Sequence, residues 1–270
     1  MRPTEHVLDM FAVPGDLSPV PGSRGHSVRA GDLVLSPGRE TAVQAELNPR
    51  LARLALDLDT RAGRDHRDLR IAMPVPARDG SWVVDGWAAT RYEPGTQQLT
   101  DLAATRAVGA VLHAELARAL GSWAEVPRTG RWAVAERIAF EETPMPAAGL
   151  GAQGDRLLGL LADARDSSPL GPEQLVHGDL AGNVLLDPGG APVVIDVAPY
   201  WRPALWAEAV VVLDCVVQWG ADRSVMHEWV GGARRQAMIR AAIFRLLSDR
   251  PTNIGLHEQV LVAILDGARP

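Results

Sequence analysis

Residues 175–187 read LVHGDLAGNVLLD, and residues 193–196, which follow a Pro-Gly-Gly turn, read VVID. The apolar runs predict two strands. Asp179, Asn183 and Asp196 interrupt these runs at strand ends, where a fixed backbone lets side chains reach a ligand. Two carboxylates and an amide placed in this way could hold a substrate hydroxyl and one or two magnesium ions. The pattern therefore predicts a site for phosphoryl transfer, because packing gives no reason for these polar residues.

The combination of His177-Gly178-Asp179, Asn183 and Ile195-Asp196 resembles the catalytic loop and metal-binding aspartate of the aminoglycoside phosphotransferase and choline kinase group, which are small-molecule relatives of protein kinases. It is most similar to an actinobacterial branch in which an Asp-x-x-Pro-Tyr-Trp-Arg-Pro stretch follows, as at residues 196–203. The likeness covers nearly the whole chain and is strongest at residues 175–219. It implies an α+β, two-lobed, protein-kinase-like fold. Residues 1–93 would form a small N-lobe with an antiparallel sheet, and residues 94–270 a larger, mainly helical C-lobe.

The resemblance also implies a role for each polar residue. Asp179 would accept a hydrogen bond from the attacking hydroxyl and take its proton, although a capping or turn aspartate is the ordinary alternative. Asn183 and Asp196 would bind Mg²⁺ through their side-chain oxygens. His177, the other catalytic-loop residue, is expected to brace the loop by hydrogen bonding rather than to transfer protons. ATP or GTP would be the co-substrate, and a hydroxyl of a small molecule the acceptor.

Further nucleotide and substrate contacts follow from the same resemblance. Residues 21–26 would form a phosphate-covering loop, for which an ordinary turn is nearly as good an interpretation. Residues 87–95 would join the lobes, and backbone groups there would hydrogen-bond a purine. Trp201 would line the acceptor pocket, and Arg202 would either bind an anionic group there or brace the loop. The predicted cofactor-binding residues are Gly22, Ser23, Arg24, Gly25, Ser36, Ala88 and Ala89.

Two features depart from the family pattern. Only Leu180, Ala181 and Gly182 separate Asp179 from Asn183, one residue fewer than in most relatives. Gly182 could absorb the tighter turn, because glycine adopts backbone angles closed to other residues. The chain also contains no lysine, so all 27 residues in the Lys+Arg count are arginine. Relatives hold the nucleotide phosphates with a lysine on the third strand of the N-lobe, and Ser36 occupies the expected position here.

The missing lysine leaves several alternatives open. Arg24, Arg29 or Arg39 could supply the charge, because a guanidinium binds phosphate oxygens through its planar fork. For each of them, an ordinary surface arginine is the favoured interpretation. Alternatively, the chain is a pseudokinase-like protein that binds a nucleotide or metabolite without efficient transfer. A third interpretation is a repurposed catalyst that phosphorylates a biosynthetic intermediate before elimination.

Composition narrows the classes of partner and compartment. With 270 residues and 47% hydrophobic content, the chain can bury a substantial core. A net charge of −6 argues against nucleic-acid or acidic-membrane partners, which usually require a basic face. Cys215 is the only cysteine and lies in an apolar run, which favours a buried thiol. No secretory signal is visible at the N-terminus, so we expect a cytoplasmic protein.

Periodicity and turn residues predict the remaining elements. Residues 17–37 should form strands and a hairpin that turns at Gly31-Asp32, followed by a helix over 41–58 and a solvated charged loop over 57–70. Two more strands are expected at 70–77 and 81–88, joined by a turn at residues 78–80. The chain should be mainly helical from residue 101, with further helices at 132–142, 155–166, 203–219, 227–248 and 256–268.

Overall fold

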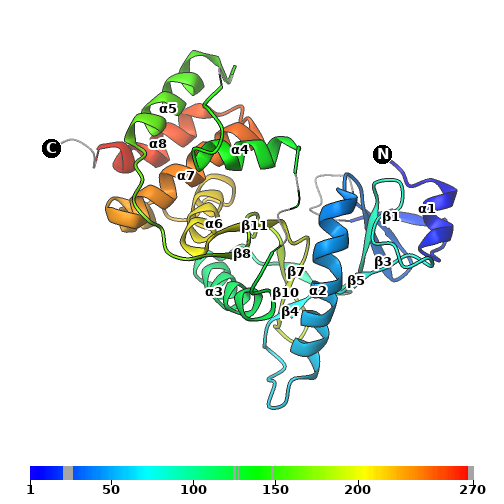
Figure 1. Cartoon of the computed structure of the whole chain (residues 1–270). Helices are drawn as coiled ribbons and strands as arrows, with labels where there is room; N and C mark the ends of the chain where they lie inside the picture. Colours follow the sequence, from blue (N-terminus) through cyan, green and yellow to red (C-terminus); the bar gives the residue numbers. More distant parts are fainter. Residues whose placement is uncertain (21–26, 124–125, 127, 147–148, 267–270) are drawn as a thin grey trace. The chain divides into compact units, whose positions relative to one another are not determined.

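The computed structural model describes the whole chain except residues 21–26, 124–125, 127, 147–148 and 267–270 (Figure 1). The chain forms two compact units. The first unit comprises residues 1–99, 118–126 and 182–197, and the second comprises 100–117, 127–181 and 198–270. The predicted α+β class, with an antiparallel sheet near the N-terminus and a helical C-terminal region, is confirmed. The lobe boundary predicted between residues 93 and 94 stays a prediction.

The first unit begins with helix α1 (Glu5–Met10) and is built on a five-stranded antiparallel sheet of order β1-β2-β3-β6-β5. The predicted two-residue turn is present, because Ala30 pairs with Leu33 and Gly31 has a φ of +59°. Ala30, Leu35 and Ala89 bring the buried face of the sheet against α1, where Val7 is fully buried. The strands are β1 (Leu17–Pro19), β2 (Val28–Ala30), β3 (Leu33–Ser36), β5 (Pro74–Val75) and β6 (Ala88–Arg91).

Two strand predictions were wrong in their limits. The strand predicted at 70–77 is divided into β4 (Arg70–Ile71) and β5, which belong to different sheets. Prolines at 74 and 76 have no N–H with which to continue a ladder. The strand predicted at 81–88 instead starts at Ala88, because Asp85 and Gly86 have φ values of +49° and +78° and make a tight turn between Val84 and Trp87. An Asp-Gly pair is a strong signal for a hairpin turn of this kind.

Helix α2 (Thr41–Thr60) follows β3 and packs against β4 and β5. Its buried leucines, which recur every three or four residues at 47, 51, 54 and 58, form the apolar stripe of an amphipathic helix. The helix continues two residues beyond the predicted end at residue 58, so the charged loop begins at Arg61.

A second sheet in the first unit has the order β4-β10-β9-β7. Its strands β9 (Val184–Leu186) and β10 (Pro192–Val194) form an antiparallel hairpin, and β10 runs parallel to β4. β7 (Gln97–Gln98) covers the other edge of β9. The hairpin therefore places residues 183 and 195, which lie just outside its paired residues, at the same end of the sheet.

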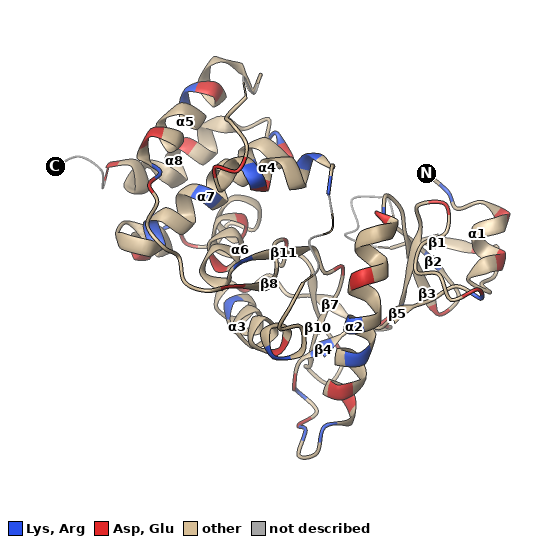
Figure 2. Ribbon diagram, in the orientation of Figure 1, with Lys and Arg blue, Asp and Glu red and all other residues tan. Residues whose placement is uncertain are grey.

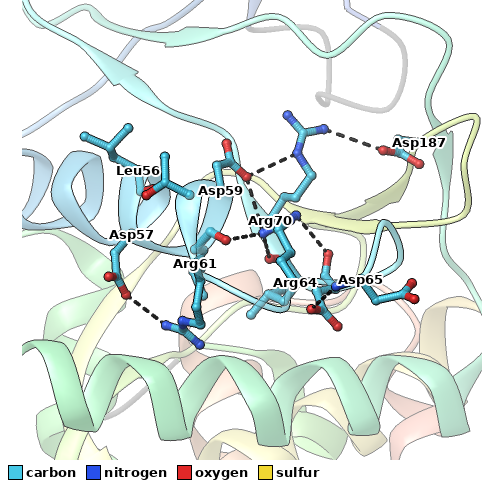
Figure 3. A network of polar contacts seen from close by, with 12 residues as sticks. Leu56, Asp57, Asp59, Arg61, Arg64, Asp65, Arg70 and Asp187 are labelled. Carbon is cyan, nitrogen blue, oxygen red and sulfur yellow. Dashed lines mark hydrogen bonds and ion pairs between the residues drawn. The ribbon is translucent and has the colours of Figure 1, made fainter.

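Charged residues fasten this sheet to the end of α2 (Figure 3). The guanidinium of Arg70 lies 3.1 Å from Glu93, and 3.6 Å from both Asp59 on α2 and Asp187 in the β9–β10 turn. Residues 57–70, predicted to form a solvated loop, thus include side chains whose ion pairs hold the hairpin in place.

The second unit combines a two-stranded antiparallel ribbon with helices. Strand β8 (Glu173–His177) pairs with β11 (Pro199–Pro203), and α6 packs on both. Trp206 on α6 lies at the centre of the core, in edge-to-face contact with Tyr200 on β11 and Phe244 on α7. The helices are α3 (Leu102–Ala119), α4 (Arg131–Ala139), α5 (Gly151–Ala164), α6 (Ala204–Gln218), α7 (Gly232–Asp249) and α8 (Ile254–Asp266), with a 3₁₀ helix η1 (Arg223–Trp229) before α7.

Helices α4, α5, α6 and α8 agree with the sequence predictions to within a few residues at each end. The helix predicted at 227–248 is divided into η1 and α7, because the backbone between them is not helical and Gly232 has a φ of +55°. Glu208 and Asp214 are the only charged residues on α6 (Figure 2). Cys215 on this helix is buried, as predicted. Within the described part of the chain, no helix combines the length and apolar character needed to cross a membrane.

Candidate functional site

The loop that begins at His177 is braced by the imidazole of that residue. His177 is fully buried at the end of β8. Its Nδ1 accepts hydrogen bonds from the backbone N–H of Asp179 at 3.1 Å and of Ala198 at 3.4 Å. Its own backbone N–H donates to Nε2 of His113, 3.2 Å away. Burial, reinforced by the neighbouring His177, lowers the pKa of His113 to about 3, so His113 is a neutral acceptor. These contacts are those of a residue that shapes the loop.

Gly178 is required by the close approach of β11. A Cβ added at residue 178 would lie 2.4 Å from Cδ2 of Tyr200 and 3.2 Å from Trp206. The backbone N–H of Gly178 donates to the carbonyl of Ala198 at 3.0 Å, which closes the loop onto the following strand. The Gly at the centre of the His-Gly-Asp motif is therefore explained by packing.

The side chain of Asp179 is 40% exposed and is held by an arginine from a distant helix. Nη2 of Arg245 on α7 donates to Oδ1 of Asp179 at 2.6 Å. The same guanidinium pairs with the buried Asp214 on α6. Burial raises the pKa of Asp214 to about 7, although the Arg245 charge opposes the shift. The motif does not indicate either partner, because each lies more than 30 residues from Asp179. Their signal in the sequence is a charge within a short apolar run, VVVLDCVV at residues 210–217 and AAIFRLL at residues 241–247.

Asn183 and Asp196 lie at the ends of adjacent strands in the first unit. The backbone N–H of Ile195 donates to the carbonyl of Asn183 at 3.0 Å, so the hairpin register places the two side chains on adjacent strand ends. Gly182 has a φ of +84°, which is the conformation that the shortened loop was expected to need. Asp196 has a φ of +49°, a strained value for a residue with a side chain. The side chain of Asp196 is 45% exposed.

This pair offers donors suited to magnesium. An amide oxygen and a carboxylate oxygen are hard ligands, and Mg²⁺ in phosphoryl-transfer sites is bound through one or two carboxylates together with phosphate oxygens and water. Across the described residues, no group of three His, Cys, Asp or Glu side chains is placed to hold a metal ion. A cation at Asn183 and Asp196 would share its coordination sphere with phosphate oxygens and water. The two residues fit such a shared site.

A guanidinium lies beside the Asp196 carboxylate. Nη1 of Arg39, which follows β3, is 2.6 Å from Oδ1 of Asp196. Ser36, at the end of the same strand, shares a 2.9 Å hydrogen bond with the hydroxyl of Ser27. Arg29, another candidate, donates to the carbonyl of Gly31 and lies with its guanidinium carbon 4.0 Å from the centroid of the Tyr92 ring. Of the contacts described for these three residues, that of Arg39 is made with the predicted metal-binding aspartate.

The other predicted nucleotide contacts are placed as follows. Ala88 and Ala89 are buried on β6 and pair with Ser36 and Leu35 on β3. Ala89 also pairs with β5, so its strand has a neighbour on each side. Gly22, Ser23, Arg24 and Gly25 lie outside the described residues.

The two residues predicted for the acceptor pocket have different surroundings. Trp201 is half-buried on β11, opposite Leu175. Arg202 is buried and pairs with Glu136 on α4, with Glu142 at 2.7 Å and with Glu173 at 3.5 Å. Three carboxylates around one guanidinium favour the bracing role that the sequence left open for Arg202.

Comparisons with known proteins identify the family of the chain. No curated protein matches the chain significantly. Among solved structures, an aminoglycoside phosphotransferase from Alicyclobacillus acidocaldarius is 12% identical with a TM-score of 0.50, over 98% of this chain and 90% of that one. A choline/ethanolamine kinase family protein from Mesorhizobium loti is 20% identical with a TM-score of 0.49, over 95% of this chain and 97% of that one. The first of these shows a shared fold. The model of the phosphotransferase enzyme family matches residues 31–199, which is more than half of the chain and includes every residue from His177 to Asp196. The chain therefore belongs to the phosphotransferase enzyme family.

Proposed function

We propose that this protein transfers the γ-phosphoryl group of ATP or GTP to a hydroxyl of a small molecule. Family membership supports phosphoryl transfer in general. The observation that carries the specific proposal is the placement of Asn183 and Asp196 on adjacent strand ends, with Asp196 held at a φ of +49°. Such backbone angles are uncommon for residues with a side chain, and they occur at ligand sites as well as in turns.

Asp179 is the base in this proposal. Its carboxylate accepts a hydrogen bond from the acceptor hydroxyl and takes the proton as the hydroxyl oxygen bonds to the γ-phosphorus. The bond from the γ-phosphorus to the β,γ-bridging oxygen breaks, and the nucleoside diphosphate leaves. Asn183 and Asp196 would hold Mg²⁺, which neutralises the charge of the phosphate oxygens. Only three residues separate Asp179 from Asn183, so one short loop carries both the base and a metal ligand.

Arg39 is the residue that we propose supplies the missing phosphate-binding charge. In a chain without lysine, arginine is the remaining side chain with a permanent positive charge, and Arg39 already lies beside the proposed metal-binding carboxylate. A planar guanidinium can bind two phosphate oxygens at once. With nucleotide bound, Arg39 would turn from Asp196 to the phosphates.

A second candidate function is binding of a nucleotide or metabolite without efficient transfer. The observation that favours it is Ser36, whose hydroxyl is engaged by Ser27 and cannot replace an ammonium group. The two functions predict different products. Nucleotide binding with no phosphorylated product would favour the binding protein, and a product that lacks both phosphate and water would indicate phosphorylation followed by elimination.

The test uses the full chain. Calorimetric titration with ATP and then GTP, each with Mg²⁺, measures binding, and a mass-spectrometric screen of hydroxylated metabolites detects transfer. We expect Asp179→Asn to abolish transfer while nucleotide binding remains, and Asp196→Asn to abolish transfer and weaken binding. Asp163→Asn, at an exposed aspartate on α5, is the control. Undiminished transfer in both site variants would reject these assignments. We place the reaction in the cytoplasm, where nucleotide and magnesium are available.

A further inference from the structure

We propose that Arg245 is a positioning residue that orients the Asp179 carboxylate, and that Asp214 holds Arg245 in place for this purpose. The inference rests on the proposed role of Asp179 as the base. It assigns a part in the reaction to two helices, α6 and α7, that the sequence motif does not include.

The contacts form a chain from the core to the loop. Nε of Arg245 lies 2.9 Å from Oδ1 and 3.1 Å from Oδ2 of Asp214. Nη2 bonds to Oδ2 of Asp214 and also lies 2.6 Å from Oδ1 of Asp179. A third carboxylate, Asp249, is 3.8 Å from Nε. One guanidinium therefore links a buried carboxylate to the exposed one at the reacting position.

Burial differs sharply along this chain of contacts. The side chains of Arg245 and Asp214 are each 4% exposed, whereas that of Asp179 is 40% exposed. A buried arginine with two bonds to a buried carboxylate has little freedom to turn. The core therefore fixes the direction in which Nη2 of Arg245 donates its hydrogen bond to Asp179.

Stability alone does not explain the arrangement. Replacing a buried ion pair with apolar residues of similar size is often neutral or stabilising, so α6 and α7 could pack well without Arg245 and Asp214. The nearby α6 residues Val210, Val211 and Val212 are apolar and buried, as are Ile243 and Phe244 on α7. The charged pair thus interrupts an apolar interface at the point where it reaches Asp179.

The two ends of Asp179 are held independently. Its backbone N–H donates to Nδ1 of His177, and its side chain accepts from Arg245. Catalytic groups must be held close to their productive geometry, and a displacement of about 1 Å can cost roughly a hundredfold in rate. The positive charge of Arg245 is compensated by the carboxylate of Asp214. Asp179 therefore accepts from an oriented donor that is already paired with a second carboxylate.

The experiment compares Arg245→Lys, Arg245→Ala and Asp214→Asn with the control Arg240→Met. Arg240 is also buried on α7, but it donates hydrogen bonds to Gln236 and to the carbonyl of Asp166. Release of ADP from Mg-ATP is measured with the acceptor from the screen, or with water. We expect the first three variants to lower kcat by roughly 10- to 100-fold with a KM for ATP within about twofold of wild type. Added guanidinium should restore part of the kcat of Arg245→Ala alone.

Several results would overturn the inference. A kcat loss in the Arg245 variants no larger than that of Arg240→Met, or a loss that only follows the unfolded fraction in circular dichroism, would leave Arg245 a structural residue. If Arg245→Ala does not fold, Arg245→Lys and Asp214→Asn decide the question in the same assay. Full activity in both would reject the positioning role.

A further measurement separates this inference from the proposed function. Urea unfolding of Arg245→Lys, Asp179→Asn and the double variant gives the coupling between the two side chains without any turnover. If the change in unfolding midpoint of the double variant equals the sum of the two single changes, Arg245 does not hold the Asp179 side chain. This result would overturn the positioning role even if Asp179 is the base. Full activity in Asp179→Asn, or no ADP release by the wild type, would overturn the proposed function and remove the basis of the inference.

Discussion

The guanidinium of Arg39 lies 2.6 Å from Oδ1 of Asp196, and both residues belong to the first unit. A carboxylate that is proposed to hold magnesium is thus accompanied by a permanent positive charge. The residue that has this charge follows β3, three positions after Ser36. The lysine was expected at Ser36, whereas the positive charge is supplied by Arg39, in the segment that follows the same strand.

Removing Arg39 should weaken nucleotide binding. Loss of one charge-assisted contact costs about 1.5–3 kcal/mol, which corresponds to roughly a 10- to 150-fold weaker affinity for Mg-ATP. Calorimetry should show this loss in Arg39→Ala and a smaller one in Arg39→Lys, because an ammonium keeps the charge but not the fork. Arg29→Ala is the matched control, since Arg29 contacts Gly31 and Tyr92 instead. Equal affinity for ATP in Arg39→Ala and wild type would contradict the proposal for Arg39.

Gly178→Ala should destabilise the protein by about 1–3 kcal/mol, because the new methyl group would overlap the buried Tyr200 ring. Urea unfolding measures the change. Gly159→Ala is the control: no atom lies within 4 Å of its added Cβ, and alanine at this exposed position in α5 should stabilise the helix by up to about 1 kcal/mol. A neutral Gly178→Ala would mean that β11 can move away from the loop at little cost.

Arg202→Met should unfold more easily without losing affinity for the acceptor. The change leaves Glu136, which is 8% exposed, as an unpaired buried carboxylate, and this costs about 3–5 kcal/mol. The double variant Arg202→Met/Glu136→Leu removes both charges and should recover most of the loss in urea unfolding. A higher KM for the acceptor in the well-folded double variant would instead assign Arg202 to substrate binding.

His113 should make stability depend on pH. Burial lowers its pKa from 6.5 to about 3, so between these values the unfolded chain binds a proton that the folded chain does not. The free energy of unfolding should therefore fall as the pH drops from 6.5 towards 3, by at most about 1.4 kcal/mol per pH unit. Above pH 6.5 this contribution is fully present.

His113→Gln tests this dependence, because its amide oxygen can still accept the N–H of His177. Urea unfolding at several pH values should show a shallower slope below pH 6.5 than in the wild type. His66→Gln, which removes a histidine whose side chain is 70% exposed, is the control. Identical slopes in His113→Gln and wild type would exclude His113 as the source.

Local signals in the sequence were sufficient for much of the fold. The apolar runs around residues 175–195 predicted two strands where the structure has three, β8, β9 and β10, and the helix predicted from Thr41 is present as α2. Predictions failed where a short-range turn signal was overlooked. The Asp85-Gly86 turn moved the start of one expected strand to Ala88, and the interruption before Gly232 divided one expected helix, because both segments need backbone angles that regular strands and helices do not allow.

The sequence by itself determined the His-Gly-Asp motif, the downstream Asn183 and Asp196, and the absence of lysine, because these depend only on residue type and spacing. Tertiary structure decided which charges meet them. Arg39 reaches Asp196 across 157 positions, and Arg245 reaches Asp179 across 66, through packing between elements that share no local pattern. Ion pairs need atoms within a few ångströms of each other, and chain spacing alone does not specify distances between elements far apart in the sequence.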